Sequence, residues 1–367
     1  MVGSLMHTPT FSGKTVAGML ASIFIIIILI CGLTLPGQAQ SSQPPVETVA
    51  EKLNHPVGID VAPDGKVYFT EFGLNGALKV LIPGQGKIET AIPNLVSAAG
   101  VAVGPEGKVY VVETAEGKVW SYDPETGRAD VVTEAKGIWG IDLDAEGNIY
   151  LTVRSKDEGK VLKIPAGGGQ PETLIEGLTL PYGLDVASNG DIYIAEFGEL
   201  ASPTGTIKVW RAASGKLETL ASNLANPYDV AVAQDGTVYF TVKAGKVYII
   251  REGEVKLFVE GFMRLYGIAL TSDGSTLYLA EFGSPAGVSG REGDGTIRKI
   301  TLVPPITEQL KESLESLEEA VSSLSMMVWL AVVVSIVSLA VSLTVLALAM
   351  KMAKSGRPVE TRRKGRR

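Results

Sequence analysis

Cysteine and histidine are nearly absent from this sequence. The 367-residue chain contains one cysteine, Cys31, and two histidines. A single cysteine excludes an intramolecular disulfide, so a packed core must stabilise the fold. Cys31 follows Ile30, which is too large for the small residue that usually precedes a lipid-attachment cysteine. His55 is the one histidine beyond the first 39 residues, and it has either a catalytic role or an ordinary place in a loop.

Charge is absent from two stretches, one near each end of the chain. Residues 19–35 are 17 uncharged residues rich in Ile and Leu, with Lys14 as the one charge before them. Gly37 and Ala39 supply the small residues of a cleavage site. We therefore expect residues 1–39 to be a secretory signal peptide, with an uncleaved membrane anchor as the alternative. Residues 40–45 follow as a polar linker.

The second uncharged stretch, residues 326–350, is 25 residues long and can cross a bilayer as a helix. Residues 304–325 before it have helical hydrophobic spacing and predict a short stalk. The tail at 351–367 has eight Lys and Arg residues against one acidic residue, Glu360. This asymmetry predicts a cytoplasmic tail and an extracellular main domain. It explains the basic tail better than nucleic-acid binding does, so we expect no nucleic-acid partner.

The stalk and the predicted membrane span share one helical face. The spacing of four and three residues that begins in the stalk continues through Ser335, Ser338 and Ser342. Small and hydroxylated residues on one face allow helices to approach closely in a membrane. We therefore predict a homo-oligomer through the stalk and residues 326–350. The alternative is that the serines bond carbonyls of their own helix and face lipid.

Between the two ends, one pattern occurs six times. Residues 180–198, LPYGLDVASNGDIYIAEFG, are one copy, with two strands joined by a turn at Asn189 and Gly190, which both tolerate positive φ. The opening positions of the copies are Gly58, Gly100, Gly140, Gly183, Asp229 and Gly267. Their spacing is about 42 residues, the length of one four-stranded propeller blade. The sequence therefore predicts an all-β, six-bladed β-propeller over residues 46–303.

One strand-like segment precedes the first copy. Residues 47–53 resemble the predicted outer strands at 88–95, 171–178 and 217–224. The sixth copy has no such segment after residues 296–303. We therefore expect residues 47–53 to pair with that last strand and close the ring, which removes an exposed edge.

Two sets of residues should meet on one face of the propeller. The first set precedes the opening positions and consists of Val57, Ala99, Trp139, Tyr182, Tyr228 and Tyr266. The second set ends the second strands and consists of Glu71, Glu113, Val153, Glu196, Val242 and Glu281. Loops at 199–205 and 284–295 lie beside them, where binding usually resides. The four aromatic and four acidic members are our candidate ligand-binding residues.

The GxxVxPDGxxYxxE-type repeat resembles the six-bladed propellers of the NHL-repeat, gluconolactonase and strictosidine-synthase-like group. The resemblance covers residues 46–303 and implies the fold more than the activity. Gluconolactonase-like enzymes hold a divalent metal at the axis, through Glu, Asn or Asp at the places that the first set occupies here. Val, Ala, Trp and Tyr are poor metal ligands, so that site is not carried over. Streptogramin-lyase-like propellers rely on a histidine near the axis, whereas His55 lies outside both sets.

The acidic and aromatic residues leave two interpretations open. The glutamates either bond backbone N–H groups of the turn that follows them or bind a cation or sugar hydroxyls. Asp60, Asp142 and Asp185 share one inner-strand position, and Asp229 occupies an opening position. These aspartates either make structural hydrogen bonds or line a channel that holds water or a divalent cation, the one cofactor they suggest. The aromatic residues either stack on a ligand or plug the channel.

The net charge of the exported part indicates which ligands it should favour. The leader and tail contain nine of the 33 Lys and Arg residues but one of the 40 acidic residues, so the exported part is near −15. Such a charge favours cationic or neutral ligands. We expect a single-pass surface protein whose propeller binds an extracellular small molecule, glycan or protein. The alternatives are a gluconolactonase-like hydrolase with an altered cation site, and a structural part of the cell envelope.

Overall fold

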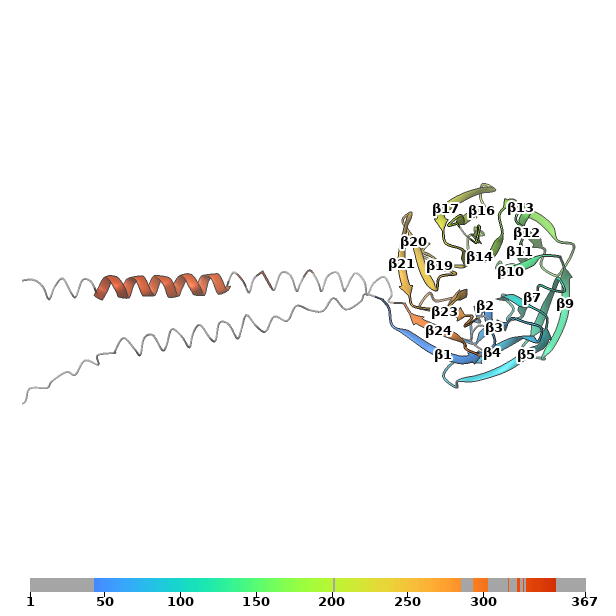
Figure 1. The fold of residues 1–367 in the computed structure, drawn as a ribbon, viewed down its shortest axis with the longest axis horizontal. Coiled ribbons are helices and arrows are strands. Elements are labelled where there is room, and N and C mark those ends of the chain that lie inside the picture. The colour runs from blue at the N-terminus through green and yellow to red at the C-terminus, as the bar shows by residue number, and fades with distance from the viewer. Residues whose placement is uncertain are drawn as a thin grey trace, which may run out of the picture. The chain divides into compact units, whose positions relative to one another are not determined.

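Six four-stranded antiparallel sheets form a closed ring in the computed structural model of the chain (Figure 1). The structure describes residues 43–200, 202–284 and 293–302, together with residues 316, 322–323, 326 and 328–347. The predicted six-bladed propeller is therefore confirmed. The predicted signal peptide, most of the linker and stalk, the loop at 285–292 and the basic tail lie outside the described residues.

Each blade has its inner strand near the axis and its outer strand at the rim. Blade 1 consists of β2 (Pro56–Val61), β3 (Val67–Glu71), β4 (Gly76–Ile82) and β5 (Lys87–Leu95). Blade 2 consists of β6 (Ala98–Val103), β7 (Val109–Glu113), β8 (Lys118–Asp123) and β9 (Arg128–Glu134). Blade 3 consists of β10 (Ile138–Leu143), β11 (Ile149–Val153), β12 (Gly159–Ile164) and β13 (Glu172–Leu178). Blade 4 consists of β14 (Pro181–Val186), β15 (Ile192–Glu196), β16 (Gly205–Arg211) and β17 (Lys216–Leu224). Blade 5 consists of β18 (Pro227–Val232), β19 (Val238–Val242), β20 (Lys246–Arg251) and β21 (Glu254–Glu260). Blade 6 consists of β22 (Leu265–Leu270), β23 (Thr276–Glu281), β24 (Gly295–Thr301) and, as its outer strand, β1 (Val46–Leu53).

Strand β1 closes the ring, as the sequence predicts. It pairs antiparallel with β24, with Glu47 opposite Lys299 and Leu53 opposite Gly295. Figure 1 shows this N-terminal strand beside the C-terminal strand of the same blade. Ala50 and Leu53 are buried in a cluster that joins the sixth and first blades. The closing strand therefore contributes to the core between blades as well as to the sheet.

The turn between the first two strands of a blade depends on glycine. In blade 4, Gly190 has a φ of 82°, and its N–H donates to the carbonyl of Ala187 at 2.8 Å. We expected both Asn189 and Gly190 to suit positive φ, but Gly190 alone adopts it. Asn189 contributes through its side chain, whose Oδ1 accepts from the N–H of Asp191 at 3.0 Å. The turn thus combines one left-handed residue, Gly190, with an Asx-type hydrogen bond from Asp191 to Asn189.

The hydrophobic core lies between neighbouring blades. One cluster joins blades 1 and 2 and another joins blades 4 and 5, each through buried side chains of both blades. Phe69 and Phe240 are fully buried, and such a side chain contributes about 1.5–3 kcal/mol. Each blade therefore packs against a neighbour on both of its faces, and losing one neighbour would expose a buried cluster.

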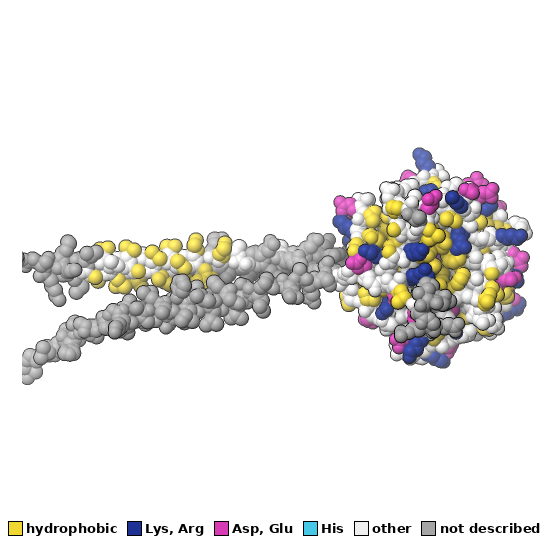
Figure 2. Space-filling view, in the orientation of Figure 1, with side chains coloured by type: hydrophobic (Ala, Val, Ile, Leu, Met, Phe, Trp, Pro, Cys, Tyr) yellow, Lys and Arg dark blue, Asp and Glu magenta, His cyan; other side chains and the backbone are white. Residues whose placement is uncertain are grey.

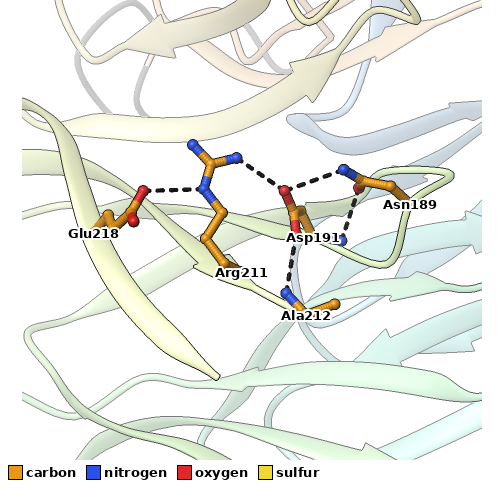
Figure 3. A network of polar contacts seen from close by, with 5 residues as sticks. All are labelled: Asn189, Asp191, Arg211, Ala212 and Glu218. Carbon is orange, nitrogen blue, oxygen red and sulfur yellow. Dashed lines mark hydrogen bonds and ion pairs between the residues drawn. The ribbon is translucent and has the colours of Figure 1, made fainter. Parts of the chain in front are cut away.

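A polar network ties two turns of blade 4 together (Figure 3). The Arg211 guanidinium donates to Asp191 at 2.8 Å and to Glu218 at 3.0 Å. Asp191 also accepts from the N–H of Ala212 at 2.9 Å. Burial acts to raise the pKa of Asp191, but the bonds from Arg211 and Ala212 outweigh it and lower that pKa. The Asp191 side chain is 8% exposed and that of Glu218 is 50% exposed, so the two carboxylates should contribute unequally.

We expect Asp191→Asn to lower the free energy of unfolding by about 1–2 kcal/mol, because the buried bond from Arg211 loses its charge assistance. The matched control is Glu218→Gln, on the exposed side of the same arginine, which should change it by no more than about 0.5 kcal/mol. Urea unfolding of the propeller measures both. Equal effects of the two substitutions would contradict this account of the network.

A second unit follows the propeller, beginning at Leu302. It includes the helix Val328–Ala347, which is long and apolar enough to cross a membrane by length and composition. Ser335 and Ser342 donate to the carbonyls of Ala331 and Ser338 at 2.8 and 2.9 Å. These are the bonds within one helix that our alternative described. Association of the helix with another copy stays a prediction.

Candidate functional site

A bulge at the start of the inner strand directs the mouth residues. In blades 3 to 6 the pairing of the first two strands shifts register around Trp139, Tyr182, Tyr228 and Tyr266. A bulge re-aims the side chain that it contains. The opening glycine then permits close approach of the next blade, since a Cβ at Gly140 would lie 2.3 Å from the carbonyl oxygen of Tyr182. These residues meet on one face of the propeller, which we call the mouth.

Threonines fix the backbone of the mouth, and the sequence analysis missed them. The hydroxyl of Thr152 accepts from the N–H of Gly140 at 2.8 Å and donates to the carbonyl of Tyr182 at 2.6 Å. Thr241 donates in the same way to the carbonyl of Tyr266 at 2.7 Å. Each threonine precedes the last residue of a second strand, so its recurrence in three blades, as Thr70, Thr152 and Thr241, was the available signal. These bonds hold two of the candidate tyrosines in place across blade boundaries.

Seven aromatic rings form a continuous arc at the mouth. The aromatic arc consists of Phe72, Trp139, Tyr182, Phe197, Tyr228, Tyr266 and Phe282. Its tightest pair is Tyr228 and Tyr266, stacked at 4.0 Å with their hydroxyls 3.1 Å apart. Trp139 and Tyr228 are buried, at 9% and 6% exposure, whereas Tyr182 and Tyr266 are half-buried. The rings therefore pack on one another and still present aromatic surface.

The three phenylalanines of the aromatic arc were not predicted. Each follows a candidate glutamate in a Glu-Phe-Gly sequence, at Phe72, Phe197 and Phe282. Their backbone N–H groups bond the segment just before the inner strand, as Phe197 does to the carbonyl of Leu180 at 3.0 Å. This bond turns the chain back over the mouth. The repeated Glu-Phe-Gly triplet was the signal, and it was visible in the sequence.

His55 also lies at the mouth, although we placed it outside both residue sets. Its ring stacks on Phe282 with centroids 4.4 Å apart. Its Nε2 lies 3.2 Å from the carbonyl oxygen of Ser284. The backbone of His55 has a φ of 50°, which lets the short segment after β1 turn sharply into β2. The imidazole thus extends the line of rings at the mouth beyond Phe282.

Two arginines lie over rings of the aromatic arc. The guanidinium carbon of Arg154 is 4.2 Å from the ring centroid of Trp139 and 4.9 Å from that of Tyr182. Arg264 lies over Phe282 at 5.8 Å. Figure 2 views this face and shows hydrophobic side chains gathered at its centre, with Lys and Arg among them and acidic side chains mostly at the rim. The mouth is therefore locally basic within an acidic domain.

The four candidate glutamates are engaged in hydrogen bonds within the scaffold. Glu71, Glu113, Glu196 and Glu281 each accept from a backbone N–H in the loop that precedes their own blade, at 2.9, 2.8, 2.6 and 2.6 Å. Our structural interpretation placed this bond in the following turn instead. Burial acts to raise the pKa of Glu281, but bonds from Met263, Thr296 and Arg298 outweigh it and lower that pKa. Ligand binding by these glutamates stays a prediction.

The four aspartates lie on an axial cavity beneath the aromatic arc. This cavity has a volume of about 220 Å³ and is lined by Asp60, Asp142, Asp185 and Asp229, with Trp139, Tyr228 and Tyr266 at the mouth end. Each aspartate accepts from an N–H of the next inner strand, as Asp185 does from Val232 at 2.6 Å. Because the axial edge of an inner strand has no strand beside it, these bonds satisfy donors that would otherwise be unpaired.

Burial at the axis raises the pKa of every one of these carboxyls. Desolvation is the main cause at Asp60, Asp185 and Asp229, and it raises the pKa to about 6, about 7 and about 8 respectively. The pKa of Asp142 is also well above its ordinary value, through desolvation and then through repulsion from Asp185. Hydrogen bonds from neighbouring N–H groups offset only part of the effect. The cavity thus favours protonated carboxyls at mildly acid pH.

The residues at the axis do not fit the divalent metal of gluconolactonase-like propellers. At the places where those enzymes have oxygen ligands, Val57, Ala99 and Trp139 form a buried apolar cluster with Tyr182 and Tyr266 packed on it. Among the described residues, no group of three or more His, Cys, Asp or Glu side chains is placed to hold a metal. The aspartates lie deeper and bond backbone N–H groups.

Solved structures similar to this chain are six-bladed propellers. A gluconolactonase from Xanthomonas campestris has a TM-score of 0.58 and 12% identity over 70% of this chain and 89% of that chain. Regucalcin from Agrobacterium tumefaciens, a calcium-binding protein, has a TM-score of 0.59 and 11% identity over 70% and 94%. Virginiamycin B lyase from Staphylococcus aureus has a TM-score of 0.51 and 17% identity over 71% and 99%. These identities show the fold alone. No protein-family model and no curated protein matches the sequence.

Proposed function

We propose that this chain is a membrane-attached propeller that binds an extracellular ligand at its mouth. The observation that carries the proposal is the aromatic arc, whose half-buried rings lie at the centre of one face with Arg154 stacked on them. Aromatic and Arg side chains contribute most of the binding energy in many recognition sites. The closed ring holds them in fixed positions, which lowers the entropy cost of binding.

The membrane attachment rests on the apolar helix and the charges beside it. The helix Val328–Ala347 can cross a bilayer, and eight basic residues follow in the tail at 351–367. The positive-inside rule then puts the propeller outside. Protease treatment of intact cells should digest the propeller and spare an epitope tag at the C-terminus. Protection of the propeller, with digestion of the tag, would reverse the proposed topology.

Binding is better supported than hydrolysis. The hydrolase alternative has the shared fold behind it, but the metal-ligand places of gluconolactonase-like enzymes hold apolar and aromatic side chains here. The candidate glutamates are already bonded to the scaffold, and Glu196 also lies 2.9 Å from the Lys208 ammonium. A carboxylate held in this way is poorly placed to activate water. The aromatic surface, by contrast, needs no further group to bind a ligand.

The proposal is tested by capture of small molecules on the purified propeller. The domain is incubated with an extract of spent growth medium, and bound species are detected by native mass spectrometry. We expect species that bind the parent protein and are lost in Tyr182→Ala. The matched control is Tyr122→Ala, which removes a half-buried tyrosine of β8 whose strand partner, Val109, lies at the turn end of β7. The same bound species in all three proteins, or none in the parent, would contradict the proposal.

A further inference from the structure

The arginines of the propeller divide into two classes. Those on the strands pair with carboxylates: Arg128 with Asp130, Arg211 with Asp191, Arg251 with Asp235 and Arg298 with Glu281. Among the described residues, Arg154 and Arg264 at the mouth form no ion pair with a carboxylate. This is unexpected in an exported chain with 39 acidic against 24 basic residues. Two guanidinium groups therefore have charge available for a ligand.

Stacking prepares Arg154 for an anion. Its guanidinium lies against the rings of Trp139 and Tyr182, and such stacking orients the planar group and leaves N–H donors at its edge. Those donors match the two oxygens of a carboxylate. Arg264 lies over Phe282 and is close enough to Tyr228 for its charge to lower the pKa of that phenol, although burial and Tyr266 dominate and raise it. Positive charge is thus present at two places along the aromatic arc.

The mouth side of the propeller also has exposed apolar side chains. Leu74, Leu200 and Met263 belong to loops on the mouth side, and they are 82%, 72% and 57% exposed. Together with the half-buried rings, they give the mouth side exposed apolar surface. The cavity below disfavours the anionic end, because it is lined by four aspartates. A ligand that uses both features has an apolar body and an anionic group that stays at the rim.

We propose that the ligand bound at the mouth is a small aromatic carboxylate, with its ring on the aromatic arc and its carboxylate on Arg154. This inference rests on the proposed function and specifies the ligand class. It differs from the expectation of cationic or neutral ligands, which we based on net charge. Net charge describes the whole exported chain, whereas a bound group responds to charges within about 10 Å, beyond which salt screens them.

Three probes with one ring system and different charges test the proposal: indole-3-acetate, indole-3-acetamide and tryptamine. Titration calorimetry or ligand-observed NMR with the purified propeller should give the tightest binding for the acetate. The neutral amide should bind at least about 10-fold more weakly, since a charge-assisted bidentate bond is lost. Arg154→Gln should weaken the acetate by about 10-fold and change the amide by less than about 2-fold. Arg154→Lys should recover only part of the loss, because it keeps the charge without the planar fork.

The matched control is Arg128→Gln, which removes an arginine of β9 paired with Asp130 and should leave all three affinities unchanged. Unaltered thermal unfolding of the variants shows that they are folded. Equal binding of the three probes, lost in Tyr182→Ala, would overturn the carboxylate assignment and leave binding at the mouth intact. Absence of binding by all three would overturn the aromatic-carboxylate class, while the capture experiment with Tyr182→Ala judges the proposed function separately.

Discussion

A chain that begins at Asn54 should not form a stable propeller and should show no cooperative unfolding transition. It lacks β1, so the full length of β24 would be an unpaired edge, and the cluster between the sixth and first blades would lose Ala50 and Leu53. Since Phe69 and Ile297 belong to the same cluster, water would reach side chains that are now fully buried. We expect a loss of about 5 kcal/mol or more, which approaches the whole stability of a typical domain. Urea unfolding followed by circular dichroism measures it.

Two controls separate loss of the strand from shortening of the chain. A chain that begins at Val46 retains β1 and should unfold like the longer protein. Within the strand, Leu53→Ala should cost about 2–4 kcal/mol, because it leaves a cavity at a side chain that is 4% exposed. Glu47→Ala removes a side chain that is 62% exposed and 3.7 Å from Lys299, so it should cost no more than about 0.5 kcal/mol. An unchanged midpoint and slope for the chain starting at Asn54 would refute the closing role of β1.

The ring closure and the blade count were predictable because they depend on repetition. Six copies at one spacing require six equivalent strand pairs, and the unmatched segment at 47–53 had one free partner. The mouth residues were predictable for the same reason, since Trp139 and the three tyrosines occupy one position in the repeat. Position within a repeat is thus a reliable guide to which face of the propeller a residue occupies.

The chemistry of the mouth was harder to predict because it depends on differences between the copies. Arg154 stands where three other blades have Phe72, Phe197 and Phe282. Its contact with Trp139 joins the end of β11 to the start of β10. A composition-based charge balance could not locate that arginine on an aromatic surface. The glutamates, in contrast, recur because the scaffold needs their hydrogen bonds, so their recurrence indicated structure as readily as binding.

The carboxyl at the axis that should have the largest effect on stability is Asp229. It takes an opening position that is glycine in the other five blades. Its side chain fits because the preceding position in the ring is Gly183, where a Cβ would lie 1.8 Å from the Asp229 Oδ1. Asp229 accepts from the N–H of Ile268 at 3.1 Å and from that of Val230 at 3.0 Å. These bonds favour the ionised form, but desolvation outweighs them and raises the pKa to about 8.

The free energy of unfolding should therefore fall as pH rises from 5 to 9. Between its ordinary pKa near 3.8 and the folded value of about 8, Asp229 holds a proton in the folded state and loses it in the unfolded state. The folded state binds more protons in this window, so stability decreases with pH. Asp60 and Asp185 act in the same direction, with losses that level off near pH 6 and pH 7 respectively, where the folded state also releases the proton. Because the side chains still face the cavity, where water moderates the penalty, we expect a total loss of about 3 kcal/mol.

Asp229→Asn should flatten this profile, since an amide of nearly the same shape does not titrate. The variant should gain stability relative to the parent as pH rises, by about 1–2 kcal/mol at pH 9. Asp273→Asn is the matched control, because Asp273 has a pKa lowered to about 2 by bonds from Thr271 and Ser275. The contribution of Asp273 to stability is complete above its ordinary pKa and is lost only at lower pH. The substitution should therefore not alter the slope of the free energy of unfolding between pH 5 and 9. Urea unfolding at a series of pH values gives the three profiles, and parallel profiles for the parent and Asp229→Asn would show that Asp229 is ionised throughout this range.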